Sequence, residues 1–235
     1  MAAAYFYLAS LSHTAEEFVL DEPASRHMVQ VLRMQEGETL MLTDGRGLRA
    51  AATILDAHKK HCQVRIGERK YQKPDTPHTA IALSLLKNSS RFEWFLEKAT
   101  ELGIAEIIPL KCMRTEKQQF RADRMQSIME SALIQSQQAW MPVFREPVAF
   151  NTFLELALSD QKFIAHCEPQ EKKQLSEALH VSASSRLILI GPEGDFTEEE
   201  IRSANESGFT AVSLGEHRLR SETAALAAAA LLKLV

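Results

Sequence analysis

Cysteine is scarce in this chain, which has only three among its 235 residues. Cys62, Cys112 and Cys167 lie far apart and are odd in number, so they predict free thiols in a reducing compartment and exclude a disulfide framework. No Cys-x-x-Cys pair occurs, and we therefore expect no bound metal. Together these absences favour a cytoplasmic protein.

Other absences narrow the class of protein further. The net charge is −4, so binding to nucleic acid would depend on a local basic patch. The N-terminus lacks a charged region, and the only long apolar run is the alanine-rich C-terminus, which fits a core helix; we expect no signal peptide and no membrane span. The motifs Gly-x-Gly-x-x-Gly and Gly-x-x-x-x-Gly-Lys are missing, which argues against a nucleotide-binding α/β enzyme.

The first part of the chain, residues 1–72, has the pattern of short strands. Asp44-Gly45 lies between two apolar runs, which is a strong hairpin signal. Several short strands at close spacing predict a small β-barrel. The expected strands contain the apolar runs Val29–Leu32, Leu40–Leu42, Ala50–Leu55 and Gln63–Ile66.

Basic residues flank the first of these runs. Arg26 and Arg33 would meet RNA phosphates if they lie on an exposed edge of the barrel. The alternative is a solvated charged edge with no ligand, and this segment taken alone favours that alternative.

A change of pattern follows the polar, proline-containing segment 73–78, which we interpret as a linker. From residue 79 to residue 235, apolar runs alternate with helical patterns, as in a mostly parallel α/β sheet. The expected strands are 81–86, 104–110, 163–166, 187–190 and 211–214. The expected helices are 91–102, 121–139, 151–158, 170–179, 197–207 and 221–235.

Two glycine-containing loops stand out in this second part. Gly191-Pro-Glu-Gly194 and Leu214-Gly215 each follow an apolar run and precede a helix. Such loops present free backbone N–H groups, and ligands of parallel sheets bind beyond the carboxyl ends of the strands. We therefore expect one site built from both loops, although an ordinary turn explains either loop taken alone. Thr197 and Glu200 form a predicted capping box just after the first loop.

The order of these motifs resembles a known family. Gly191–Gly194, then Leu214-Gly215, then Leu219–Ala224 is similar to the SPOUT-class RNA methyltransferases, and most similar to the RsmE-type small-subunit rRNA uridine-N3 methyltransferases. The similarity extends over nearly the whole chain through His27–Arg33 and a set of upstream positions. That set comprises Lys87, Arg91, Lys98–Gly103, Pro109 and Arg114.

The resemblance implies a fold, an activity and partners. It implies a PUA-like RNA-binding barrel in residues 1–72, a SPOUT methyltransferase domain with a trefoil knot in residues 79–235, and a homodimer. The implied reaction is methylation of N3 of a uridine in 16S ribosomal RNA by S-adenosylmethionine. The residues implied to bind the cofactor are Cys167, Glu168, Gly191, Pro192, Glu193, Gly194, Leu214, Gly215, Leu219, Arg220, Ser221, Thr223 and Ala224; those implied to bind RNA are Arg26, Arg33, Lys87, Arg91 and Arg114.

Arg220 and Glu222 are the catalytic candidates. N3–H of uridine is a weak acid, so the site must remove its proton or stabilise the anion. Arg220 would orient the uracil or stabilise its charge. Glu222 would accept a proton, or would instead bind backbone N–H groups at the start of the last helix. His217 is a further candidate base.

The sequence departs from the family pattern at several positions. Ile134 and Gln138 occupy positions where the family usually has Glu and Arg, and Asp195 replaces a common glycine. The missing pair leaves an alternative open, in which the chain is a non-catalytic RNA-binding or ribosome-assembly factor on the same scaffold.

Overall fold

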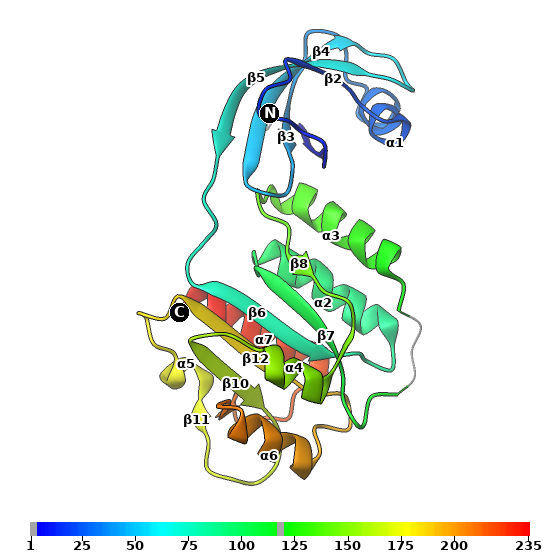
Figure 1. Cartoon of the computed structure of the whole chain (residues 1–235). Coiled ribbons are helices and arrows are strands. Elements are labelled where there is room, and N and C mark those ends of the chain that lie inside the picture. The colour runs from blue at the N-terminus through cyan, green and yellow to red at the C-terminus, as the bar shows by residue number, and fades with distance from the viewer. Residues whose placement is uncertain (1–3, 117–119) are drawn as a thin grey trace. The chain divides into compact units, whose positions relative to one another are not determined.

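The computed structural model describes residues 4–116 and 120–235, and the chain divides into two compact units (Figure 1). The first unit contains the chain up to Pro74 together with Leu133–Met141. The second unit contains Asp75–Ala132 and Pro142–Val235. Among the described residues, no helix is both long enough and apolar enough to span a membrane.

The first unit is built on a five-stranded sheet in the order β1-β3-β4-β5-β2. Strands β3 and β4 form the hairpin that Asp44-Gly45 predicts, and buried residues alternate with partly exposed ones along β4 as the period of a strand requires. The strands are β1 (Ala4–Tyr7), β2 (Glu17–Val19), β3 (Thr39–Thr43), β4 (Leu48–Asp56) and β5 (Gln63–Tyr71), and β2 is followed by α1 (Glu22–Arg26) and the π-helix η1 (His27–Val31).

The strand expected at Val29–Leu32 is wrong, because these residues belong to the π-helix η1 and its C-cap. Asp21 explains the difference, since its carboxylate accepts a hydrogen bond from the amide of Ala24 at 2.9 Å and so starts a helix before the apolar run. Within η1, Met28 is fully buried whereas Val31 is exposed. A short apolar run does not distinguish strand from helix, and here the upstream cap decides.

Residues 133–141 are an unexpected part of the first unit. The carbonyl of Ala139 accepts a hydrogen bond from the amide of Gly47, and the indole of Trp140 donates to the carbonyl of Gln72, both at 2.9 Å. Gly47 has φ +97°, and a Cβ there would lie 2.7 Å from the Trp140 ring. The close packing therefore requires glycine at this position.

The second unit contains an eight-stranded sheet in the order β11-β13-β10-β12-β6-β7-β8, with β9 also paired to β7. Its strand pairs are parallel. The strands are β6 (His78–Ser84), β7 (Glu106–Lys111), β8 (Val143–Phe144), β9 (Val148–Ala149), β10 (Gln161–Ala165), β11 (Lys173–Gln174), β12 (Ser185–Ile190) and β13 (Thr210–Ser213).

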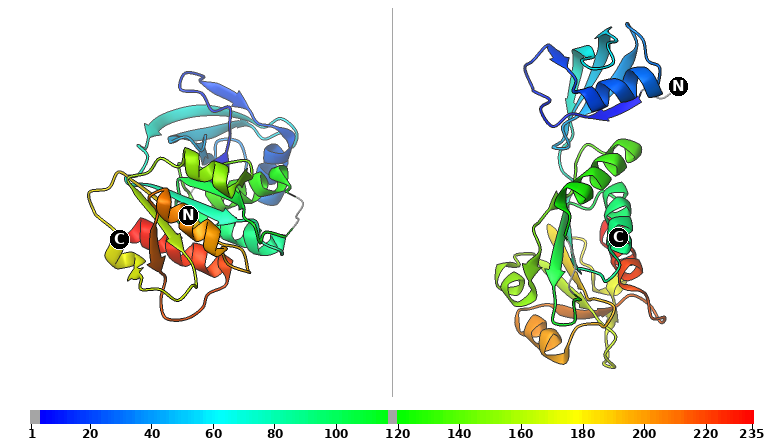
Figure 2. Two further views of the ribbon diagram at one scale, coloured as in Figure 1. Left: turned by 60° about the horizontal axis from the view of Figure 1, so that its bottom comes forward. Right: turned by 90° about the vertical axis from the view of Figure 1, so that its right-hand side faces the viewer.

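Helices cover both faces of this sheet, as a parallel sheet requires. Figure 2 shows α2 and α7 on one face and α4 and α6 on the other. Alternate residues of the central strands, such as Ala80 and Ala82, join α4 and α6 in one apolar core. The helices are α2 (Ser89–Glu101), α3 (Ala122–Ser136), α4 (Phe150–Leu156), α5 (Leu175–Ala178), α6 (Glu198–Glu206) and α7 (Ser221–Leu234).

The expected helix 170–179 is wrong over most of its length. Lys173–Gln174 form the edge strand β11, which pairs with β13, and only the four residues of α5 are helical. Pairing at the sheet edge satisfies the backbone groups that a longer helix would otherwise satisfy internally. The other helices and strands expected from residue 79 onward are present, with ends displaced by a few residues.

Candidate functional site

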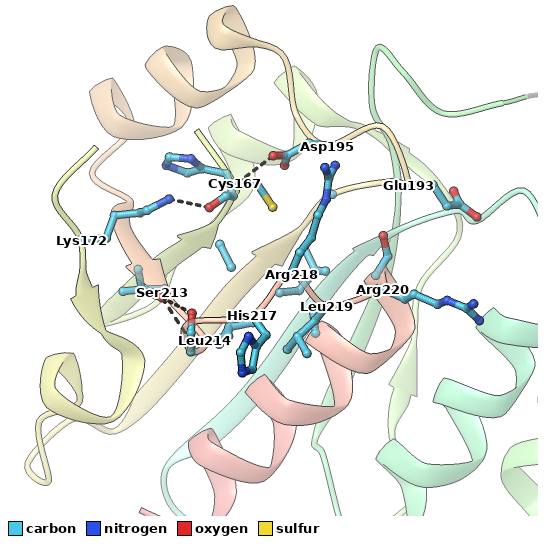
Figure 3. A pocket seen from close by; sticks show the side chains of 18 of the residues that line it. Cys167, Lys172, Glu193, Asp195, Ser213, Leu214, His217, Arg218, Leu219 and Arg220 are labelled. Atoms are coloured by element: carbon cyan, nitrogen blue, oxygen red, sulfur yellow. Dashed lines mark hydrogen bonds between the residues drawn. The ribbon is translucent and has the colours of Figure 1, made fainter. Parts of the chain in front are cut away.

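A cavity of about 710 Å³ lies in the second unit at the carboxyl ends of β10, β12 and β13, which are neighbours in the sheet (Figure 3). Its volume is within the range of sites for small molecules. Both glycine loops line it, as the sequence predicts. The loop after β10 lines it as well, so three separate segments of the chain form one site.

The cavity brings together most of the residues that the resemblance implies for cofactor binding, and it adds His217. Glu168, Gly194, Thr223 and Glu222 do not line it. The implied residues that do line it are Cys167, Gly191, Pro192, Glu193, Leu214, Gly215, Leu219, Arg220, Ser221 and Ala224.

Several charged or polar residues of the lining were not expected. No motif marks them in the sequence, because they lie in loops whose path depends on the folded sheet. Asp195 is the exception, since it replaces a glycine that is common in the family. These residues are His166, Lys172, Asp195, Ser213, Glu216 and Arg218.

The first glycine loop is fixed by the side chain that follows it. Phe196 is fully buried and packs against Phe150 with ring centroids 5.4 Å apart. A Cβ on Gly191 would lie 3.1 Å from the Phe196 ring, so glycine lets the loop pass over this ring without displacing it. The predicted capping box between Thr197 and Glu200 is confirmed and starts α6 directly afterwards.

The second loop needs glycine for a different reason. Gly215 has φ +132°, and no atom lies within 4 Å of a Cβ built there, so the backbone conformation excludes other residues. The hydroxyl of Ser213 accepts a hydrogen bond from the amide of Gly215 at 3.3 Å and donates to its carbonyl at 3.0 Å. These two bonds hold the turn that leads to α7.

Lys172 and Asp195 stabilise the loop after β10. The ammonium group of Lys172 donates hydrogen bonds to the carbonyls of His166 and Glu168, at 2.6 and 3.0 Å. Asp195 accepts one from the amide of Cys167 at 2.7 Å. Burial and the Lys172 cation lower the pKa of His166, so its ring is neutral at pH 7. Burial and the Asp195 carboxylate raise the pKa of the Cys167 thiol.

An ion-pair cluster connects the first loop to α2 and α7. The guanidinium of Arg91 lies 3.5 Å from a carboxylate oxygen of Glu222 and 4.0 Å from one of Glu193. Glu193 also accepts a hydrogen bond from the amide of Lys87 at 3.0 Å. Glu222 is 7% exposed, and in the described part of the chain its Oε2 has no hydrogen-bond partner. Arg91 is therefore the cation that pairs with the buried carboxylate of Glu222.

The residues expected to bind RNA have several intramolecular partners. Arg114 donates to the carbonyls of Gly194 and Phe196, at 2.7 and 3.2 Å, and the Lys87 ammonium lies 3.1 Å from Glu116. With Arg91, they surround the first glycine loop.

In the first unit, Arg26 is paired with Glu22 at 2.9 Å on the surface. Arg33 is exposed and adopts φ +56°. The structure thus shows an intramolecular contact for each of the three candidate RNA-binding residues of the second unit, whereas Arg33 presents its side chain to solvent.

Arg220 is the N-cap residue of α7, and its carbonyl accepts the first helical hydrogen bond, from the amide of Ala224 at 2.8 Å. Its side chain is exposed. In Figure 3 the Arg218 side chain points toward Asp195, whereas that of Arg220 points away, toward α2. Arg220 thus lies at the edge of the cavity with its side chain exposed.

Two family models match the chain. An RNA methyltransferase domain matches residues 73–233, and an RNA methyltransferase PUA domain matches residues 20–67. The chain belongs to this RNA methyltransferase family. The expected combination of an N-terminal PUA domain with a parallel α/β methyltransferase domain is confirmed, whereas the trefoil knot stays a prediction.

Individual relatives match over nearly the whole chain. Ribosomal RNA small subunit methyltransferase E of Synechocystis is 30% identical, with 94% of this chain and 74% of that protein covered. A probable rRNA-methyltransferase from Porphyromonas gingivalis has a solved structure with 36% identity and a TM-score of 0.91, covering 97% and 96% of the two chains. Ribosomal RNA small subunit methyltransferase E from Neisseria gonorrhoeae, bound to S-adenosyl methionine, has 29% identity and a TM-score of 0.87, covering 99% and 97%.

The Arg91 contacts of the methyltransferase domain predict an energetic coupling. Arg91→Ala leaves the buried Glu222 carboxylate without its cation and should lower the free energy of unfolding by about 1–3 kcal/mol. Glu222→Gln should cost clearly less in the Arg91→Ala background than in the wild type. Urea unfolding of the two single variants and the double variant measures this coupling.

Lys87→Ala is the matched control, because it removes an exposed pair with Glu116 and should cost less than about 1 kcal/mol. Additive effects of Arg91→Ala and Glu222→Gln would show that Arg91 does not stabilise Glu222, and would leave Arg91 available for RNA.

Proposed function

We propose that this protein transfers a methyl group from S-adenosylmethionine to N3 of a uridine in 16S ribosomal RNA of the small subunit. The observation that carries the proposal is the cavity formed by the three loops after β10, β12 and β13, in a chain whose full length matches a small-subunit rRNA methyltransferase bound to this cofactor. Family membership supports the reaction class. The choice of uridine N3 rests on the motif resemblance.

The residues of the cavity fit this cofactor. Apolar side chains suit an adenine ring, and the turns at Gly191 and Gly215 bring backbone N–H and carbonyl groups to the wall. Bound there, the cofactor supplies an electrophilic methyl group. The apolar lining residues are Ala165, Ile190, Leu214, Leu219 and Ala224.

The chain's own contribution is to hold the base and assist its deprotonation. Arg220, exposed at the edge of the cavity, orients the uracil or stabilises negative charge on its oxygens. His217 lines the cavity and is a candidate proton acceptor. Glu222 lies outside the lining beside Arg91, so its role is better explained as support of the first loop than as direct proton transfer. Catalysis then depends mainly on the placement of N3 against the methyl group.

The assembly we propose is a cytoplasmic homodimer with a knotted methyltransferase domain. Leu226, Ala227, Ala230 and Leu231 of α7 are only partly buried within one chain, although this helix is almost wholly apolar. A second subunit would cover them. The exposed Arg33 supports a role of the PUA domain in RNA binding.

The alternative, a non-catalytic RNA-binding or assembly factor, is not favoured. It rests on the absence of the family's Glu and Arg at Ile134 and Gln138. The cofactor loops are intact, and the protein names of several relatives are those of enzymes.

A direct experiment tests the reaction. Small subunits from a strain lacking this gene, incubated with the protein and S-adenosylmethionine, should gain one 3-methyluridine per 16S rRNA. Mass spectrometry of digested nucleosides measures it, and subunits incubated without cofactor are the control. Cofactor binding without any new methylated nucleoside would leave only the non-catalytic alternative.

Substitutions at the two glycines of the first loop should have different effects. Gly191→Ala brings the new Cβ to 3.1 Å from the Phe196 ring and 3.2 Å from its backbone nitrogen, so the ring or the loop must shift by a few tenths of an ångström and cofactor affinity should fall about tenfold. Gly194→Ala is the matched control, because its Cβ meets only the flexible Arg114 side chain at 3.4 Å and Gly194 does not line the cavity. Calorimetry with S-adenosylmethionine measures both, and equal losses would contradict the assignment.

Arg220→Ala should lower the methylation rate about 10²–10³-fold with little change in cofactor affinity, since one preorganised charge-stabilising donor is lost. Lys at this position should restore little of the rate, because an ammonium group cannot make the two parallel hydrogen bonds of a guanidinium. Single-turnover kinetics at saturating cofactor and RNA, beside a melting curve, measures the effect. A near-normal rate with a lower melting temperature would mean that Arg220 only supports the start of α7.

A further inference from the structure

We infer that Asp195 is a positioning and specificity-determining residue of the cavity, which ties two cofactor loops together and favours the sulfonium cofactor over its demethylated product. The inference rests on the proposed function and extends it to the discrimination between S-adenosylmethionine and S-adenosylhomocysteine. It concerns this chain in particular, because Asp195 is where its sequence departs from the glycine pattern.

Both oxygens of the Asp195 carboxylate are used. Oδ2 accepts a hydrogen bond from the amide of Cys167 at 2.7 Å, and Oδ1 accepts one from the amide of Phe196 at 2.8 Å. Cys167 follows β10, whereas Asp195 follows β12, so one side chain connects two loops that are 28 positions apart in the chain. Both residues line the cavity. The width of the cavity between these loops therefore depends on Asp195.

The backbone conformation of Asp195 is unfavourable for a residue with a side chain, and the hydrogen bonds of that side chain offset the strain. The residue adopts φ +64°, a conformation that glycine reaches freely and that other residues adopt less favourably. Its amide donates to the carbonyl of Pro192 at 3.0 Å, which closes the tight turn. Asparagine and aspartate tolerate this conformation best, and here the two accepted hydrogen bonds offset the strain.

The carboxylate also gives the cavity wall a negative charge. S-adenosylmethionine carries one positive charge more than S-adenosylhomocysteine, because methyl transfer converts the sulfonium into a neutral thioether. Asp195 is one of three carboxylates of the lining, with Glu193 and Glu216, and the lining also holds three cations, Lys172, Arg218 and Arg220. At an effective dielectric constant of about 20, one unit charge at about 10 Å still changes relative affinity on the order of tenfold. Asp195 thus assists release of the product relative to the cofactor.

The test compares both ligands on the intact protein. Calorimetry should show that Asp195→Asn lowers the affinity for S-adenosylmethionine roughly tenfold relative to that for S-adenosylhomocysteine, because the variant keeps the size of the side chain and loses its charge. The amide can accept only one of the two hydrogen bonds that the carboxylate accepts, so both ligands should also lose some affinity in common. Asp195→Gly should show the same change of ratio with additional loss for both ligands, since it also removes the tie between loops. The glycine variant relieves the backbone, so a folding defect does not obscure the result.

Asp160→Asn is the matched control. Asp160 also accepts hydrogen bonds from backbone amides, those of Ser184 at 2.8 Å and Ser185 at 3.2 Å, but it does not line the cavity. It should change thermal stability and leave the affinity ratio as in the wild type.

Cys167 provides an independent readout inside the cavity. It is exposed, whereas Cys62 and Cys112 are buried, so a neutral alkylating reagent such as iodoacetamide should label Cys167 first. Burial and the Asp195 charge raise the pKa of this thiol, so removal of the charge should increase the thiolate fraction and the labelling rate near pH 8. Bound cofactor should protect it.

The outcomes separate this inference from the proposed function. Equal loss of affinity for both ligands in Asp195→Asn, with unchanged labelling of Cys167, would overturn the specificity role. Unchanged affinity in Asp195→Gly would overturn the positioning role. If the wild type binds S-adenosylmethionine and shows either result, the proposed function stands and the inference fails; if the wild type binds neither ligand, the proposed function itself fails.

Discussion

The burial of Phe196 is the contact on which the rest of the site depends. Its ring lies in the core under the first glycine loop, comes within 3.1 Å of a Cβ built on Gly191, and is followed directly by the capping box that starts α6. Side chains from other segments then attach to the loop above it. Arg114 donates to its carbonyls, Asp195 ties it to the loop after β10, and Glu193 connects it to the start of α2.

These contacts hold the first glycine loop in one conformation in the absence of a ligand. A loop held by separate partners loses little conformational entropy on binding, so more of the interaction energy appears as affinity. Rigidity also suits a reaction whose rate depends on the placement of a methyl group against a weakly acidic nitrogen. Most charged side chains near the loop are paired with other groups of the protein. They stabilise the conformation of the loop, and few of them are left to contact the substrate.

The sequence predicted the parts of the structure that depend on local pattern. Apolar runs that end at Gly191 and Leu214 correctly placed β12 and β13 and one cavity at their carboxyl ends, and the Thr197 capping box fixed α6. Features that depend on tertiary contacts were missed. The edge pairing of β11 and the place of residues 133–141 in the first unit leave no local signature. Lys172 and Arg218 were missed for the same reason, since only the folded sheet brings their loops to the cavity.

The role of the basic residues near the first glycine loop also depends on tertiary contacts. From the sequence, Lys87, Arg91 and Arg114 looked available for phosphates, and in the structure each has an intramolecular partner: Glu116, Glu222 and the carbonyl of Gly194, respectively. If an RNA phosphate took the place of the carbonyls of Gly194 and Phe196 as partner of the Arg114 guanidinium, the loop would lose these hydrogen bonds. The role of these three basic residues in RNA binding stays a prediction. If RNA binds through them, its affinity is coupled to the order of the cofactor loop, and cofactor and RNA would each favour binding of the other, because both would depend on the same loop conformation.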